Sequence, residues 1–379
     1  MNMKTVLLSC FFCFSSAFSQ SYEVLIRDAS TNLEAKEYCV ALSNFKKAFT
    51  LQTEIGVYDY VSAASAAASC NDTKTAMEWL KAGHKLGLGK SRGEITFLQT
   101  NERFKNLSQN IEFKELLEAM ENKVIKLEEF KKKETEQWNH EIVNNQIAES
   151  TPFNQVPPGF ALYFTETEEQ KVPYIVFVPK GYKSSRQTKA IFYLHGGVNS
   201  VNDFYYKNAD VKKEPIFSVG NSFNSIIIYP FAKKDFGWMN QIKAFENIFT
   251  ILQEVEKRYN VDKNKIYLGG MSNGGTATFW FASQKETPFK AFYAFAPNPV
   301  LNIGAISFEN ITKDHPLYTI SAKDDYVFKY DDVLKIYNEN KSKAKGWNFK
   351  TIEIGSHEFI YKPEISKELL INFFSEILR

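Results

Sequence analysis

Histidine and cysteine are scarce in this chain, and charge of neither sign predominates. The 379 residues include five histidines and four cysteines, and 46 basic against 44 acidic side chains leave a formal net charge of +2. The lysines are spread among glutamates, so no basic face indicates a nucleic acid partner. After the first 20 residues, no apolar run approaches the roughly 20 residues that span a bilayer, so we expect no transmembrane segment.

The first 19 residues have the organisation of an export signal. Lys4 provides a short positive start, an apolar stretch runs from Val6 to Phe14, and residues 17–19 read Ala-Phe-Ser, a small-x-small cleavage sequence. We therefore expect residues 1–19 to be removed, which predicts an exported protein, either periplasmic or extracellular.

Removal of that segment would leave two cysteines, Cys39 and Cys70. An even pair in an oxidising compartment favours a disulfide. The helical repeat described next would bring the two together, because they lie at the ends of consecutive antiparallel helices. Two small buried apolar side chains are the alternative interpretation.

Residues 20–119 predict an all-helical domain with an internal repeat. Small and apolar positions recur with a period of 35 residues from Ala41 to Ala76: Ala41, Phe45 and Ala48 return as Ala76, Leu80 and Gly83. The pattern resembles the tetratricopeptide repeat, which implies a docking module with a protein partner that the sequence does not name. Residues 120–150, rich in glutamate and lysine, predict an exposed helical linker.

The most informative motif is Gly-x-Ser-x-Gly at residues 270–274, between an apolar run and a helix-compatible segment. Glycines on both sides of Ser272 permit a strand-to-helix turn that a Cβ would obstruct, as in a nucleophile elbow. Asn273 would then direct its backbone N–H at a developing oxyanion. A second strand pattern ends in His195-Gly196-Gly197, and the Gly196 or Gly197 N–H is the expected second donor. A glycine-serine turn in another α/β sheet would leave that motif unexplained.

Chain order restricts the choice of a catalytic base. In a nucleophile-elbow fold the acid and then the histidine follow the serine, and only His315 and His357 follow Ser272. His315 enters a strand pattern, whereas His357 lies on a loop after an alternating run, so His357 is the predicted base.

Two adjacent aspartates compete for the role of the acid. The usual turn is Gly-x-x-Asp-x-x-Val, and Ser321, Asp324 and Val327 fall on its three fixed positions. This register favours Asp324 over Asp325, although Ser321 occupies the glycine position. Trp238, after another strand end, and His195 are candidates to line the substrate pocket, with plain packing as an equal alternative for Trp238.

Residues 261–275 and 174–182 resemble the esterase and poly(hydroxybutyrate)-depolymerase-like α/β-hydrolases, with feruloyl esterases as relatives. The resemblance covers about residues 151–379. It implies a doubly wound, mostly parallel sheet and carboxylic ester hydrolysis through a serine triad and an acyl-enzyme, with no metal or organic cofactor. A peptidase on the same fold, or a binding protein without activity, are the alternatives.

Strand patterns in residues 151–379 alternate with helical ones, which favours a mostly parallel sheet with helices on both faces. The expected strands lie at 161–164, 174–178, 190–194, 226–229, 266–268, 292–295, 317–320 and 350–354.

Overall fold

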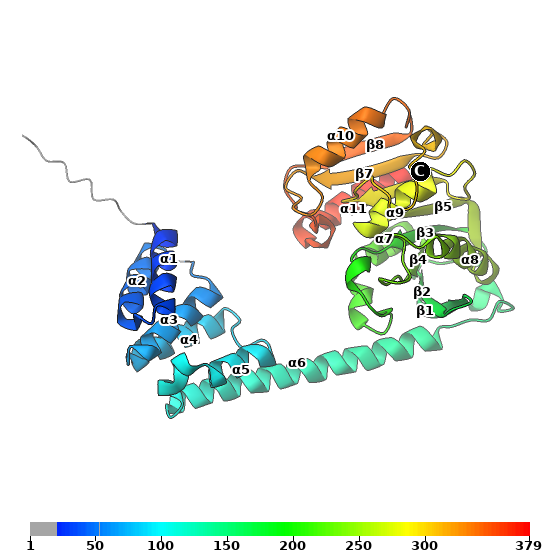
Figure 1. Cartoon of the computed structure of the whole chain (residues 1–379). Helices are drawn as coiled ribbons and strands as arrows, with labels where there is room; N and C mark the ends of the chain where they lie inside the picture. Colours follow the sequence, from blue (N-terminus) through cyan, green and yellow to red (C-terminus); the bar gives the residue numbers. More distant parts are fainter. Residues whose placement is uncertain (1–20, 53) are drawn as a thin grey trace, which may run out of the picture. The chain divides into compact units, whose positions relative to one another are not determined.

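The computed structural model describes residues 21–52 and 54–379, and the chain divides into two compact units at Lys132 and Lys133. We call them the helical unit and the sheet unit (Figure 1). The predicted export signal lies outside the described residues. Among those described, no helix is both long and apolar enough to cross a bilayer.

Consecutive helices of the helical unit pack against one another around one core. Its elements are α1 (Tyr22–Glu34), α2 (Tyr38–Leu51), α3 (Val57–Ser69), α4 (Thr73–Lys85), α5 (Arg92–Thr100), the 3₁₀ helix η1 (Glu102–Leu107) and the first part of α6 (Ile111–Asn144). The six recurring positions of the sequence repeat are all buried in α2 and α4. The recurring positions therefore lie on the core-facing sides of α2 and α4.

A disulfide joins α2 to the end of α3. Cys39 and Cys70 are bonded, with their Cα atoms 5.1 Å apart. Cys39 lies in the first turn of α2, and Cys70 caps the carboxyl end of α3. The bond fastens two neighbouring helix pairs together.

The sheet unit is built on eight strands in the order β1-β2-β4-β3-β5-β6-β7-β8. The strands are β1 (Gly159–Glu166), β2 (Lys171–Val178), β3 (Thr188–Leu194), β4 (Ile226–Pro230), β5 (Val261–Met271), β6 (Ala291–Phe295), β7 (Leu317–Ala322) and β8 (Trp347–Ile352). β1 and β2 pair antiparallel, and β3 to β8 run parallel. This order and the helical crossovers are those of the α/β-hydrolase fold, as the sequence predicted.

Helices cover both faces of this sheet, and strand residues alternate between two cores. In β2, Val176 faces the core under α8 (Ile242–Arg258), α9 (Asn273–Ala282) and α10 (Tyr330–Asn340). The neighbouring Ile175 faces the core under α7 (Ile216–Phe223) and α11 (Pro363–Ile377). Burial on both faces explains why these strands read as continuous apolar runs.

Helix α6 is shared by the two units, which corrects the expected linker. Met120 and Val124 pack in the helical core, and Trp138 and Ile142 are fully buried in the sheet unit. The Trp138 indole N–H also donates to the Tyr206 carbonyl at 2.8 Å. The sheet unit therefore begins inside α6, and not at residue 151.

Candidate active site

Ser272 occupies a strained turn between β5 and α9. Its backbone has φ 54° and ψ −115°, a conformation in which non-glycine residues are uncommon and which marks functional sites. The Ser272 N–H donates to the Phe295 carbonyl at 2.9 Å, which ties the turn to β6. A Cβ at Gly274 would lie 1.8 Å from the Leu194 carbonyl oxygen, so only glycine permits this approach of helix to sheet. The geometry is that of a nucleophile elbow.

His357 brings its imidazole to the serine from the loop after β8. Its Nε2 lies 2.8 Å from the Ser272 Oγ, and its Nδ1 lies 2.8 Å from Asp325 Oδ2. Since an ionised carboxylate only accepts, Nδ1 carries the proton and Nε2 is free to accept from the hydroxyl. His357 and Asp325 are buried, whereas Ser272 is partly exposed, so Ser272 is the most exposed residue of the three.

Asp325, and not Asp324, is the carboxylate that contacts the histidine. The Asp325 Oδ1 accepts the backbone N–H groups of Val327 and Phe328, both at 2.8 Å, which leaves Oδ2 for His357. The side chain of Asp325 is 2% exposed. The turn after β7 thus directs the second aspartate inward, and the register that favoured Asp324 was wrong by one residue.

Asp324 faces the other way and holds the histidine loop. Its carboxylate accepts the N–H of Gly355 at 2.9 Å and that of Ser356 at 2.7 Å. These hydrogen bonds lower the pKa of Asp324 from its ordinary value. Ser356 has a left-handed φ of 57°, so the carboxylate stabilises a strained backbone directly before His357.

His195 and Trp238 are structural residues, which corrects their prediction as pocket lining. Both side chains are buried. The Nδ1–H of His195 donates to the Gly196 carbonyl at 2.7 Å, and its Nε2 accepts from the Ala232 N–H at 3.0 Å. Trp238 donates its indole N–H to the His195 carbonyl at 3.2 Å. Burial lowers the pKa of His195 to about 4, so the ring is neutral, as these contacts require.

The glycine loop that His195 shapes approaches the elbow closely. A Cβ on Gly196 would lie 3.0 Å from the Ser272 Cβ, and Gly197 has a left-handed φ of 69°. The Asn273 side chain fastens the two segments, because its Oδ1 accepts the Val198 N–H at 3.0 Å. This amide contact was not predicted, because nothing in the sequence pairs residues 75 positions apart.

The segment between β6 and β7 lies beside the elbow and carries only the short 3₁₀ helix η5 (Phe308–Asn310). The longer connection after β3 contains two 3₁₀ helices, η3 (Val198–Ser200) and η4 (Ala209–Lys213), and then α7. Neither segment forms a separate cap domain. Among residues 21–52 and 54–379, no cluster of three or more histidine, cysteine or acidic side chains is arranged to hold a metal ion.

Comparisons with known proteins agree with this geometry. Residues 239–341, which include the elbow and the Asp325 turn, match the prolyl oligopeptidase family. The chain is similar to a probable feruloyl esterase C of Aspergillus terreus (strain NIH 2624 / FGSC A1156), with 28% identity over 128 residues, which cover 31% of this chain and 43% of that enzyme.

The chain is also similar to two solved structures. A thermostable esterase shares 21% identity, with a TM-score of 0.46 and coverage of 57% of this chain and 62% of that one. LpqC, a poly(3-hydroxybutyrate) depolymerase from Bordetella parapertussis, shares 12% identity, with a TM-score of 0.47 and coverage of 62% and 97%. The chain thus spans less than two thirds of the feruloyl esterase and of the thermostable esterase. The family match and the fold together describe an α/β-hydrolase fold in a chain that is similar, over part of its length, to a feruloyl esterase.

Proposed function

We propose that this protein is an exported serine hydrolase that cleaves carboxylic esters. The hydrogen-bonded chain from Ser272 through His357 to Asp325, on a strained elbow, supports the proposal most strongly. Acylation and deacylation each require a proton acceptor, an oriented imidazole and an oxyanion site, and no further group.

The chemistry would run in two balanced steps. Ser272 Oγ attacks the ester carbonyl carbon while His357 Nε2 takes its proton, and the imidazolium then returns that proton to the departing alcohol. Water, deprotonated by the same nitrogen, attacks the acyl-enzyme carbonyl carbon. The bond from that carbon to Ser272 Oγ then breaks, the imidazolium returns its proton to Oγ, and the acid is released. Asp325 keeps the tautomer and stabilises the imidazolium in both steps. The Asn273 N–H and one from Gly196 or Gly197 would stabilise the oxyanion, each worth about 3 kcal/mol.

The decisive experiment is labelling with a fluorophosphonate probe, followed by mass spectrometric location of the adduct. We expect the phosphonyl group on Ser272 alone, and we expect Ser272→Ala to lose both labelling and hydrolysis with an unchanged circular dichroism spectrum. Ser283→Ala is the matched control, because Ser283 caps the far end of the same helix. Labelling of a different serine would overturn the assignment.

A serine peptidase is the second candidate, supported by the match of residues 239–341 to the prolyl oligopeptidase family. Matched pairs of substrates with one acyl group, joined either to nitrophenol or to an amine, separate the two. We expect rapid cleavage of short-chain nitrophenyl esters and no rate jump on micelle formation, because neither connection beside the elbow in the sheet unit forms a cap domain. Comparable kcat/KM for the matched amide would favour the peptidase.

A further inference from the structure

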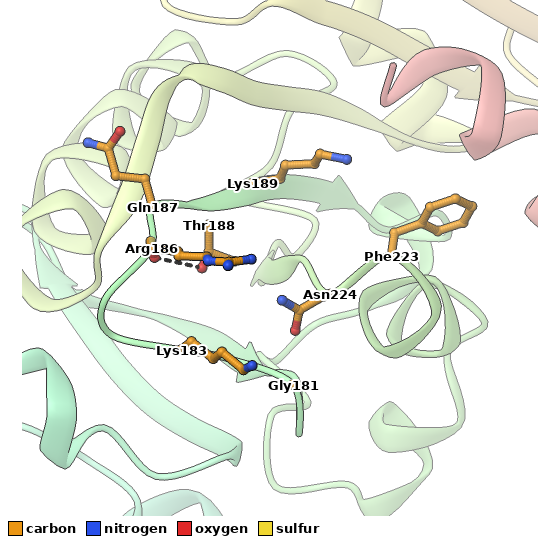
Figure 2. Close-up of a pocket in the computed structure, with 8 residues that line it drawn as sticks. All are labelled: Gly181, Lys183, Arg186, Gln187, Thr188, Lys189, Phe223 and Asn224. Atoms are coloured by element: carbon orange, nitrogen blue, oxygen red, sulfur yellow. Dashed lines mark hydrogen bonds between the residues drawn. The ribbon is translucent and has the colours of Figure 1, made fainter.

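A pocket lies at the amino ends of β3 and β4, away from the elbow. It is lined by residues of the β2–β3 connection, the start of β3 and the turn from α7 into β4, and its cavity is about 320 Å³: Gly181, Lys183, Arg186, Gln187, Thr188, Lys189, Phe223 and Asn224 (Figure 2). Ser272 follows the carboxyl end of β5, whereas this pocket surrounds the amino ends of β3 and β4. The pocket is therefore separate from the site proposed for hydrolysis.

The lining carries three cations and no carboxylate. Lys183, Arg186 and Lys189 form no ion pair among the described residues, and residues 180–190 contain no acidic side chain. In Figure 2 the Arg186 guanidinium extends across the pocket, with Lys183 and Lys189 on either side of it. Positive charge is thus concentrated here in a chain whose net charge is only +2.

The carboxylates near the start of β5 do not neutralise this charge, because they pair with other lysines. Asp262 on β5 pairs with Lys265 at 3.6 Å, and Glu256 on α8 pairs with Lys263 at 2.9 Å. Burial, with a smaller contribution from Lys265, lowers the pKa of Lys189. The opposite charge of a bound anion would offset both the cost of burying this ammonium group and its repulsion by Lys265.

We propose that this pocket binds the oxyanion group of a ligand: a phosphate, sulfate or carboxylate. The Arg186 fork suits two oxygens of such a group, and the lysines supply point charges around it. The side-chain amide of Asn224 offers a neutral donor beside these cations (Figure 2). The cavity volume is at the lower end of the range for small-molecule sites, which fits an ion or one charged sugar unit and excludes a large apolar ligand.

The test is calorimetric titration of the full chain with sodium sulfate and with inorganic phosphate, at an ionic strength kept constant with sodium chloride. We expect saturable binding with one site per chain. The double variant Arg186→Gln/Lys189→Gln should bind at least about tenfold more weakly. Lys335→Gln, an exposed change on α10, is the matched control and should bind like the wild type.

A second measurement probes the same site by chemical labelling instead of calorimetry. Sulfate should protect Lys189 from acetylation by an amine-reactive reagent, measured by mass spectrometry, and should leave Lys335 labelled.

A titration with polygalacturonate distinguishes the ligand sources. Tighter binding of the polymer through the same residues would identify a polyuronate, and binding of the inorganic ions alone would identify a free ion. Affinities equal in the wild type and the double variant, or sulfate acting no differently from chloride, would overturn the proposal.

Discussion

The imidazole of His357 donates to Asp325, while the neighbouring Asp324 accepts the backbone N–H groups directly before that histidine. Two adjacent carboxylates thus position His357 in different ways. Asp325 orients the ring, and Asp324 holds the loop that carries it.

Asparagine substitutions should separate these two roles. Asp325→Asn should lower kcat by about 10⁴-fold, because an amide cannot stabilise the imidazolium and favours the wrong tautomer. Asp324→Asn should cost far less, about tenfold to a hundredfold in kcat, because one oxygen still accepts from the loop.

The measurement is kcat and KM on a short nitrophenyl ester across pH, with Asp331→Asn on the exposed start of α10 as the control. A larger loss for Asp324→Asn than for Asp325→Asn would contradict the assignment.

Glu214 should make a contribution to the stability of the sheet unit that falls as pH rises. This partly buried carboxyl accepts from Tyr229 at 3.3 Å and from Tyr361 at 3.2 Å, with Tyr193 beside them. Burial raises its pKa from 4.5 to about 7. Because the folded state holds this proton more tightly, the contribution is fully present below about pH 4.5 and is lost as pH rises through about 7.

Glu214→Gln should remove that pH dependence. For a pKa shift of this size, it amounts to a change of at most about 3 kcal/mol in the free energy of unfolding. The measurement is the free energy of unfolding by urea at several pH values, taken as the difference between wild type and variant. A difference that does not change between pH 4 and pH 8 would be inconsistent with the raised pKa.

Removal of the disulfide should destabilise the helical unit selectively. The double variant Cys39→Ala/Cys70→Ala opens a loop with a sequence separation of 31 residues. The chain-entropy model predicts a loss of about 3–4 kcal/mol. Differential scanning calorimetry should show a lower melting temperature for the helical unit, and hydrolysis of a small ester should be unchanged. Reduction of the wild-type protein should reproduce the effect, and an unshifted transition would contradict the prediction.

The sheet unit should fold alone only when the end of α6 is retained. A chain starting at Lys133 keeps Trp138 and Ile142 in their core, whereas one starting at Thr151 exposes the surface they cover. Loss of two such buried side chains costs several kcal/mol, a large part of the stability of a domain. We expect the longer fragment to be soluble and active, and the shorter one to aggregate. A stable, fully active fragment from Thr151 would show that α6 is dispensable.

Much of the fold could be predicted because local patterns and burial agree. Each of the eight expected runs overlaps one strand, since the buried parts of most strands are apolar. The strand β5 extends further than expected, from Val261 to Met271, because its residues 263–265 are polar and exposed. The identity of the acid depended on which way one turn rotates, and spacing does not determine that rotation. The helix over residues 120–144 was expected, but its burial in the sheet unit was not, because Trp138 stands in a run of charged residues whose composition indicates exposure.

His195 does not need to contact a substrate, but its titration should lower the stability of the fold around the glycine loop at acid pH. Its pKa of about 4 in the fold, against about 6.5 when unfolded, means that stability is lost as pH falls through this interval. Glu214 acts in the opposite direction over nearly the same range. The two slopes oppose each other between about pH 4.5 and 6.5, so a flat stability profile in the wild type would conceal two titrating groups. Glu214→Gln should uncover the histidine as a rise in stability with pH.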